Sequence, residues 1–291
     1  MKRYIALLLA LALLFVGCSQ KTDKASENKE NKEVKTEVKS EEKAEKTEEK
    51  ELVKVSVGVS PTPHGEIVEV LRDEFKKEGI DVDVVVFTDY VQPNLALNDK
   101  EIDLNYFQHI PYLKEFCESR DLDLVSIANV HLEPIGLYTT KYQSIDEIED
   151  GSEILIPNDP SNGARALRLL EDAGLIKLTD YNSESITEND IAENPKNLKI
   201  TAVEAGAIPK AYGDVAAGVI NGNYAIGAGL SPAKDALLLE KIEGNPNINV
   251  VAARAEDKDN EVYQRFVKVI NSEAARKIIE EKFDGAVVPA F

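Results

Sequence analysis

The 291-residue chain has no Trp, three His, two Cys and one Met, which is the initiator. Cys18 and Cys117 are too few for a disulfide framework and lack the spacing of a metal-binding pair. His64, His109 and His131 lie in separate segments, so the sequence predicts no metal site. Lys and Arg never form a block free of acidic residues, and the formal net charge is −19. Binding to nucleic acid is therefore not expected.

Sequence motifs of enzymes are also missing. The chain contains no Gly-x-Ser-x-Gly, no Gly-rich phosphate loop and no His-Glu-x-x-His, and no sequence pattern pairs a Cys with a His. We therefore predict that the protein is not an enzyme, has no catalytic residues and needs no cofactor.

The first 18 residues have the layout of a secretory signal peptide. Lys2 and Arg3 precede an apolar run from Tyr4 to Val16, whose 13 residues are fewer than the ~20 that a membrane-spanning helix needs. The run ends at Gly17 and Cys18, and a Cys after a small residue at this point resembles a lipobox. Phe15 departs from the Leu that is usual three places before the Cys. We predict that residues 1–18 are a lipoprotein signal peptide and that Cys18 is lipidated.

Residues 19–51 are a low-complexity stretch with 9 Lys against 11 Asp and Glu and no aromatic residue. Such a composition cannot bury a core and is typical of a disordered tether. A lipid at Cys18 would anchor the protein to the cell membrane without spanning it. The folded part would then face the extracellular side or the periplasm.

From residue 52 onward, segments with strand and helix periodicity alternate. Val53, Val55, Val57 and Val59 lie on one face of a predicted strand over Leu52–Ser60. The other predicted strands are Val82–Phe87, Leu104–Phe107, Leu124–Val130, Glu153–Pro157, Leu198–Val203, Val215–Ile220 and Ile248–Ala253. The predicted helices are Gly65–Lys77, Val91–Asn98, Ile110–Glu118, Ala164–Ala173, Asn260–Ile270 and Ser272–Phe283. This alternation indicates an α/β fold with two similar lobes, in which mostly parallel sheets are covered by helices on both faces.

Ligands of open α/β sheets bind at the carboxyl ends of strands, so residues at these ends are candidates for a binding site. Tyr90 follows one strand of the first lobe, and Phe107 and His109 end another. Their spacing is equally compatible with core packing of the two aromatic rings and a surface or capping role for His109.

Polar candidates follow strands of the second lobe. Arg165 lies in the first turns of a helix, where its planar fork and the helix start could hold a carboxylate; the alternative is a surface ion pair with Glu171 or Asp159. Asn221 and Glu204 end two strands and could accept hydrogen bonds from an ammonium group, although they could equally be a turn residue and a surface carboxylate. Together these side chains suggest a site for a zwitterion, with aromatic walls around an apolar or sulfur-bearing side chain.

Several long segments of the chain, in order, resemble the methionine-binding lipoprotein family of ABC importers, and the similarity spans Val55 to Phe291. The matching segments are Phe87–Asn94, Asp103–His109, Pro157–Asn162, Gly174–Leu178, Val219–Ala225 and Gly229–Asp235.

This resemblance implies a two-lobe fold like that of the type II periplasmic binding proteins, with mixed sheets flanked by helices and two hinge crossings. We expect the crossings near Pro134–Thr140 and Val250–Ala255. Residues 52–135 and 252–291 would form lobe 1, and residues 136–251 would form lobe 2.

The resemblance also implies which residues bind the ligand. They are Tyr90, Phe107, His109, Tyr138, Asn158, Arg165, Glu204 and Asn221. The sequence departs from the family at Asn162-Gly163-Ala164, which could widen the pocket.

The implied function is capture of L-methionine outside the cell and delivery to the permease of an ABC importer, by a protein that acts as a monomer. A Met-containing dipeptide such as Gly-Met is an alternative ligand. A metal-binding transport protein is a further alternative, although the separation of the three His opposes it. A surface adhesin on the same scaffold is an alternative of another class.

Overall fold

The computed structural model describes residues 52–183 and 185–291. The predicted signal peptide, the lipidated Cys18 and the tether lie outside these residues. Among the helices of the described part, none is long and apolar enough to cross a membrane.

The first lobe is built on a six-stranded sheet with the order β13-β4-β12-β3-β1-β2. Strand β1 pairs in parallel with β2 and β3, whereas β12 runs antiparallel to β3 and β4, so the sheet is mixed. Its strands are β1 (Val53–Val59), β2 (Ile80–Val86), β3 (Leu104–His109), β4 (Leu124–Leu132), β12 (Ile248–Arg254) and β13 (Val288–Pro289). Its helical segments are η1 (Pro61–Gly65), α1 (Glu66–Val70), α2 (Arg72–Lys77), α3 (Gln92–Asn98), α4 (Ile110–Arg120), η5 (Ala255–Asp257), α9 (Glu261–Ile270) and α10 (Glu273–Phe283).

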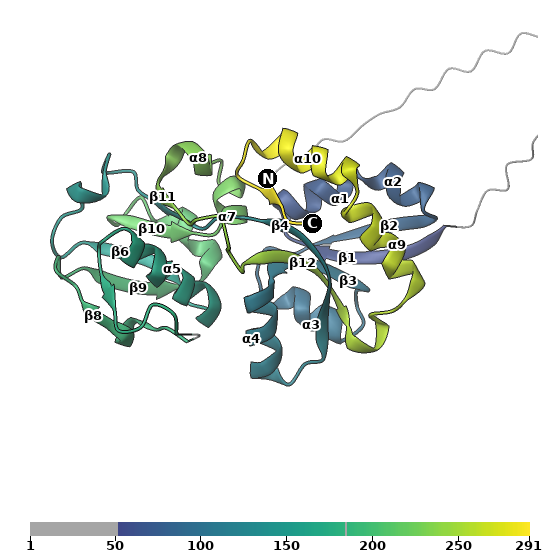
Figure 1. Cartoon of the computed structure of the whole chain (residues 1–291), viewed down its shortest axis with the longest axis horizontal. Helices are drawn as coiled ribbons and strands as arrows, with labels where there is room; N and C mark the ends of the chain where they lie inside the picture. The colour runs from purple at the N-terminus through teal and green to yellow at the C-terminus, as the bar shows by residue number, and fades with distance from the viewer. Residues whose placement is uncertain (1–51, 184) are drawn as a thin grey trace, which may run out of the picture. The chain divides into compact units, whose positions relative to one another are not determined.

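The second lobe is built on a five-stranded mixed sheet with the order β11-β5-β10-β6-β9, and a small hairpin of β7 and β8 accompanies it (Figure 1). Its strands are β5 (Gly136–Tyr138), β6 (Glu153–Pro157), β7 (Lys177–Leu178), β8 (Ile191–Glu193), β9 (Lys199–Val203), β10 (Ala217–Ile220) and β11 (Ala236–Leu239). Its helical segments are η2 (Ile145–Glu147), α5 (Pro160–Asp172), η3 (Glu188–Asp190), η4 (Ala205–Ala207), α6 (Ile208–Ala211), α7 (Gly222–Gly227) and α8 (Pro232–Asp235).

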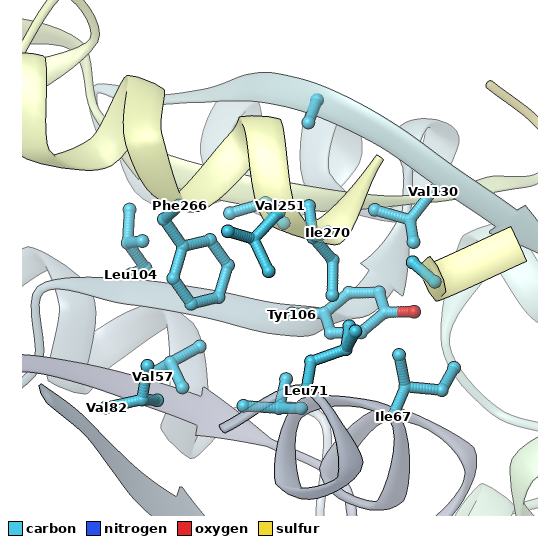
Figure 2. Close-up of a cluster of buried hydrophobic side chains, with 14 of the residues drawn as sticks. Val57, Ile67, Leu71, Val82, Leu104, Tyr106, Val130, Val251, Phe266 and Ile270 are labelled. Atoms are coloured by element: carbon cyan, nitrogen blue, oxygen red, sulfur yellow. The ribbon is translucent and has the colours of Figure 1, made fainter. Parts of the chain in front are cut away.

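The core of the first lobe lies between its sheet and helices α1, α2, α9 and α10. Val57 of β1 and Val251 of β12 are fully buried, in a cluster that includes Phe266 of α9 (Figure 2). The ring of Phe266 stacks on Phe75 of α2, with 4.5 Å between the ring centroids. Burial of each such side chain contributes about 1.5–3 kcal/mol to folding. This core holds β3 and β4 rigidly at the base of the site described below.

The chain passes between the lobes twice, through residues 133–135 after β4 and residues 240–247 after β11. The second crossing therefore precedes the predicted position, Val250–Ala255, and the predicted lobe boundary at residues 251/252 falls inside β12. Val251 and Ala253 belong to one core cluster, and Val250 and Ala252 to another on the opposite face. The predicted hinge segment is instead a central strand that is buried on both faces.

Candidate functional site

A small cavity lies between the two lobes. The first lobe and the first crossing contribute β3 residues, the start of α4 and Glu133, and the second lobe contributes α5 and the start of α7. The lining residues are Tyr90, Phe107, Gln108, His109, Tyr112, Glu133, Asn162, Arg165, Asn221, Gly222, Asn223 and Asn249.

Five of the eight sequence-predicted site residues line this cavity: Tyr90, Phe107, His109, Arg165 and Asn221. Tyr90 and Asn221, the first and last of the five, are 131 positions apart in the sequence, so it is the fold that brings these residues together.

The other three predicted residues do not line the cavity. Tyr138 is buried inside the second lobe against Leu155 and Ile220. Asn158 is exposed, and its backbone N–H donates to the carbonyl of Val203, at the end of β9. Glu204 is also exposed, and its carboxylate caps η4 by accepting a hydrogen bond from the Gly206 amide at 2.9 Å. These three are therefore left out of the site proposed below.

One wall of the cavity is aromatic. Tyr90 lies 6.1 Å from Phe107 and 5.8 Å from Tyr112 between ring centroids. The Tyr112 hydroxyl donates to the backbone carbonyl of Tyr90 at 2.8 Å, which fixes the Tyr112 ring against the Tyr90 backbone. Tyr112 is not among the predicted site residues, although its position three residues after His109, at a helix start, is a usable signal in the sequence. Such a wall suits an apolar or sulfur-bearing side chain.

His109 joins the two lobes. Its Nδ1 accepts a hydrogen bond from the Tyr112 backbone amide at 3.2 Å, so the proton lies on Nε2. That Nε2 donates to Asn162 Oδ1, in the other lobe, at 3.0 Å. Burial, reinforced by the charge of Arg165, lowers the pKa of His109 to about 4. The ring is therefore neutral at physiological pH and contributes a hydrogen bond rather than a charge.

Arg165 is 5% exposed and makes neither of the ion pairs that the sequence suggested. Its Nε lies 2.8 Å from both carboxylate oxygens of Glu240, its Nη2 also pairs with Glu240, and the same Nη2 donates to the Glu133 carbonyl at 2.6 Å. Burial tends to raise the pKa of Glu240, but the charge and hydrogen bonds of Arg165 hold it below its usual value. Both partners are therefore charged. Glu240 is not predictable as the partner from the sequence, because it lies 75 residues from Arg165.

The start of α5 is already capped. Asp159 Oδ1 accepts hydrogen bonds from the backbone and side-chain nitrogens of Asn162 at 2.8 and 3.0 Å. Asp159 thus supplies the negative charge that a helix N-terminus favours. The backbone amide of Asn162 is therefore occupied, and the carboxylate of Asp159 disfavours a second carboxylate at this helix start.

Asn221 precedes α7 and is 5% exposed. Its Nδ2 donates to Asn162 Oδ1 at 2.8 Å. Its Oδ1 is buried and has no hydrogen-bond partner among the described residues. Because buried polar atoms are nearly always paired, an orphaned acceptor on a cavity wall points to a donor on a ligand.

His64 and His131 converge on Glu133, which also lines the cavity, and the ligand atoms of the three lie within 4.8 Å of one another. Glu133 Oε1 is 2.7 Å from His131 Nε2 and 3.3 Å from His64 Nε2. The other ring nitrogens face Tyr106 Oη and Ser60 Oγ at 2.5 and 2.6 Å.

Two imidazoles and a carboxylate are a set that zinc could use, contrary to the separation that the sequence suggested. However, both rings already share the Glu133 carboxylate at hydrogen-bonding distance. Burial lowers the pKa of His64 to about 4 and of His131 to about 3, so each is neutral. The cluster is satisfied as a hydrogen-bond network. Its His64 Nε2 also lies 3.0 Å from Asn249 Oδ1, on the cavity wall.

The family model described as NlpA lipoprotein matches residues 55–291. The chain belongs to this family. The methionine-binding lipoprotein MetQ of Bacillus subtilis (strain 168) is 42% identical over 243 residues, which cover 81% of this chain and 88% of that protein. The D-methionine-binding lipoprotein MetQ of Escherichia coli (strain K12) is 41% identical over 237 residues, which cover 80% and 87%.

A solved structure shows the same fold as this NlpA-family chain. It is a nutrient binding protein from Burkholderia cenocepacia bound to methionine, with 41% identity, a TM-score of 0.79 and coverage of 81% of this chain and 100% of that one. The prediction of a two-lobe binding-protein fold is confirmed.

Of the three residues at the departure from the family pattern, only Asn162 lines the cavity of this family member. Gly163 is not among the lining residues, and a Cβ at this position would lie 3.0 Å from the Pro157 carbonyl oxygen. The glycine lets α5 approach the end of β6. Its neighbour Asn162, by contrast, lines the cavity and links His109 to Asn221.

Proposed function

We propose that this chain is the substrate-binding lipoprotein of an ABC importer and that it captures methionine outside the cell. The proposal is supported by relatives of about 41% identity that are named for methionine binding and by the methionine-bound structural neighbour. The matches cover 87% of the Escherichia coli protein and 100% of the Burkholderia cenocepacia chain.

The observation that carries the proposal is the unpaired Asn221 Oδ1 in a cavity that Arg165 also lines. An amino acid carries an ammonium group, which only donates hydrogen bonds, and a carboxylate, which only accepts them. The ammonium group can donate to Asn221 Oδ1, and the carboxylate can accept from Arg165. Glu133, on the same wall, adds negative charge for the ammonium. Tyr90, Phe107 and Tyr112 would enclose the thioether, whose contacts with aromatic rings contribute about 0.3–1.5 kcal/mol each.

We favour free methionine over a dipeptide because it is the smaller ligand, and the cavity is small and bounded by hydrogen bonds between the lobes. Lobe closure over the ligand, with residues 133–135 and 240–247 as the hinges, would form the surface that the permease recognises.

The position of the protein in the cell follows from the N-terminal sequence. Residues 1–18 would direct export, Cys18 would carry the lipid and residues 19–51 would tether the folded part to the cell membrane. The folded part would act as a monomer, within reach of the permease, on the extracellular or periplasmic side.

Calorimetry on residues 52–291, refolded from denaturant to remove carried ligand, tests the proposal. L-methionine, D-methionine, Gly-Met, leucine and Zn²⁺ would each be titrated. We expect saturable 1:1 binding of methionine and a rise of several degrees in melting temperature at a hundredfold excess over the dissociation constant. Binding of Gly-Met alone would move the site to dipeptides, and a response to Zn²⁺ without methionine would disprove methionine capture.

A further inference from the structure

We propose that Glu240 is a positioning residue for ligand capture: it holds Arg165 by one edge, fixes the part of the guanidinium that meets the ligand carboxylate, and ties the arginine to both hinge segments. The inference rests on the proposed function and deepens it, because it assigns the specificity for a carboxylate to a residue outside the cavity lining.

The geometry of the ion pair shows how Arg165 is oriented. Glu240 takes the Nε and Nη2 hydrogens, and the Glu133 carbonyl takes a second bond from Nη2. Within the described part of the chain, Nη1 makes no hydrogen bond to protein. The two-pronged fork that the sequence suggested for the ligand is therefore occupied by Glu240, and Nη1 is left for the ligand carboxylate.

Glu240 also connects the two crossings. Its backbone N–H donates to the Ile135 carbonyl at 2.9 Å, and the Ile135 N–H points back to the Glu240 carboxylate at 3.4 Å. Asn247 Nδ2, at the end of the second crossing, lies 3.2 Å from Glu240 Oε1. One carboxylate thus contacts residues 133–135, residues 240–247 and α5. An arginine held this way has a fixed position relative to both hinges, so its contact with a ligand is transmitted directly to them.

Charge explains why an acidic residue stands here. A buried guanidinium without a partner is strongly unfavourable, and Glu240 neutralises it whether or not a ligand is bound. The side chain of Glu240 is 17% exposed, at the edge of the site rather than in it. It can therefore act on the ligand only through Arg165 and the hinges.

The test compares two ligands that differ only in the carboxylate. Dissociation constants for L-methionine and for L-methioninamide, which keeps the ammonium and the thioether, would be measured on residues 52–291 by direct or competition calorimetry. In Glu240→Gln, methionine should bind at least about tenfold more weakly, as expected for loss of a charged hydrogen-bond partner, whereas methioninamide should change less than about twofold. Glu240→Asp, which keeps the charge, should recover part of the loss.

The matched control is Glu153→Gln, which breaks the ion pair between Glu153 and Lys199 in the second lobe. The two charged groups of this pair lie 2.8 Å apart, and both side chains are more exposed than those of Arg165 and Glu240. Glu153→Gln should leave both constants unchanged, and melting curves without ligand would establish that each variant is folded. Unchanged or tighter methionine binding by folded Glu240→Gln would overturn the inference, and so would an equal loss for both ligands. Wild-type protein that fails to bind methionine would overturn the proposed function as well.

Discussion

The Tyr90 hydroxyl donates a hydrogen bond to Asn223 Oδ1 at 2.5 Å, from the loop after β2 in the first lobe to α7 in the second. Next to it, the Tyr224 hydroxyl donates to the Thr88 carbonyl at 3.2 Å in the opposite direction. The rings of Tyr90 and Tyr224 lie 4.9 Å apart between centroids. This side of the cavity is therefore closed by contacts that exist only while the lobes are together.

Removing the Tyr90 hydroxyl should speed ligand release. Tyr90→Phe keeps the aromatic wall but deletes one hydrogen bond of the closed form, which contributes about 0.5–1.5 kcal/mol. We expect the dissociation rate of methionine to rise about two- to tenfold with a smaller change in the association rate. Stopped-flow displacement measures both rates. Tyr181→Phe, at an exposed tyrosine of the second lobe, is the matched control; equal effects of the two variants would contradict a role in closure.

Alanine substitutions of Asn221 and of Asn158 should have very different effects on methionine affinity, although both residues are predicted from the sequence to bind the ligand. Asn221→Ala removes a buried acceptor on the cavity wall, and loss of a hydrogen bond to a charged group costs about 1.5–3 kcal/mol, or roughly 10- to 150-fold in affinity. Asn158 is exposed and away from the cavity, so Asn158→Ala should bind methionine as the wild type does. Calorimetric titration of the two variants decides the matter, and an affinity loss in Asn158→Ala would return that residue to the site.

Stability should fall as the pH is lowered through the range of histidine titration. Burial lowers the pKa of His64 and His109 to about 4 and of His131 to about 3, from 6.5. Below pH 6.5 the unfolded chain takes up protons that the folded protein does not bind until about pH 4. The stability present above pH 6.5 is therefore lost on acidification, by up to ~1.4 kcal/mol per pH unit for each histidine.

Burial also raises the pKa of Glu133, which works in the opposite direction over its own range because the folded protein then holds the proton more tightly. Urea unfolding at pH 7, 6 and 5 measures the sum. His109→Gln should reduce the slope by close to one proton, since it removes one of the three buried rings. If the free energy of unfolding of the wild type did not change between pH 5 and pH 7, these histidines would already be protonated in the folded state.

Local sequence patterns were sufficient for most of the secondary structure. Strand β6 has the predicted bounds, β1 is one residue shorter than predicted at each end, and α9 and α10 begin one residue later than predicted. Short strands such as β5 and β11 were missed, because three or four residues in contact with neighbouring strands carry no periodicity of their own.

The candidate site was predictable where a residue ends a strand or lies in a segment that resembles the family. Tyr90, Phe107 and His109 reach the cavity in this way. Glu204 ends a strand too, yet its side chain turns back to cap η4, since a free backbone amide two residues on offers a nearer partner than the cavity does. Position at a strand end fixes where a backbone goes, not where a side chain points.

By itself, the sequence determined the N-terminal export and anchoring signals that we propose, the α/β alternation and the family, because these depend on composition and on neighbours close in the chain. Only the tertiary structure decided that Glu240 pairs with Arg165, that Asn249 reaches the cavity and that His64 comes to lie beside His131 and Glu133. The contact between Arg165 and Glu240 joins residues 75 positions apart, and the contact between His64 and Asn249 joins residues 185 positions apart. Their proximity follows from how β12 returns to the first sheet after the second lobe, and no local periodicity encodes that return.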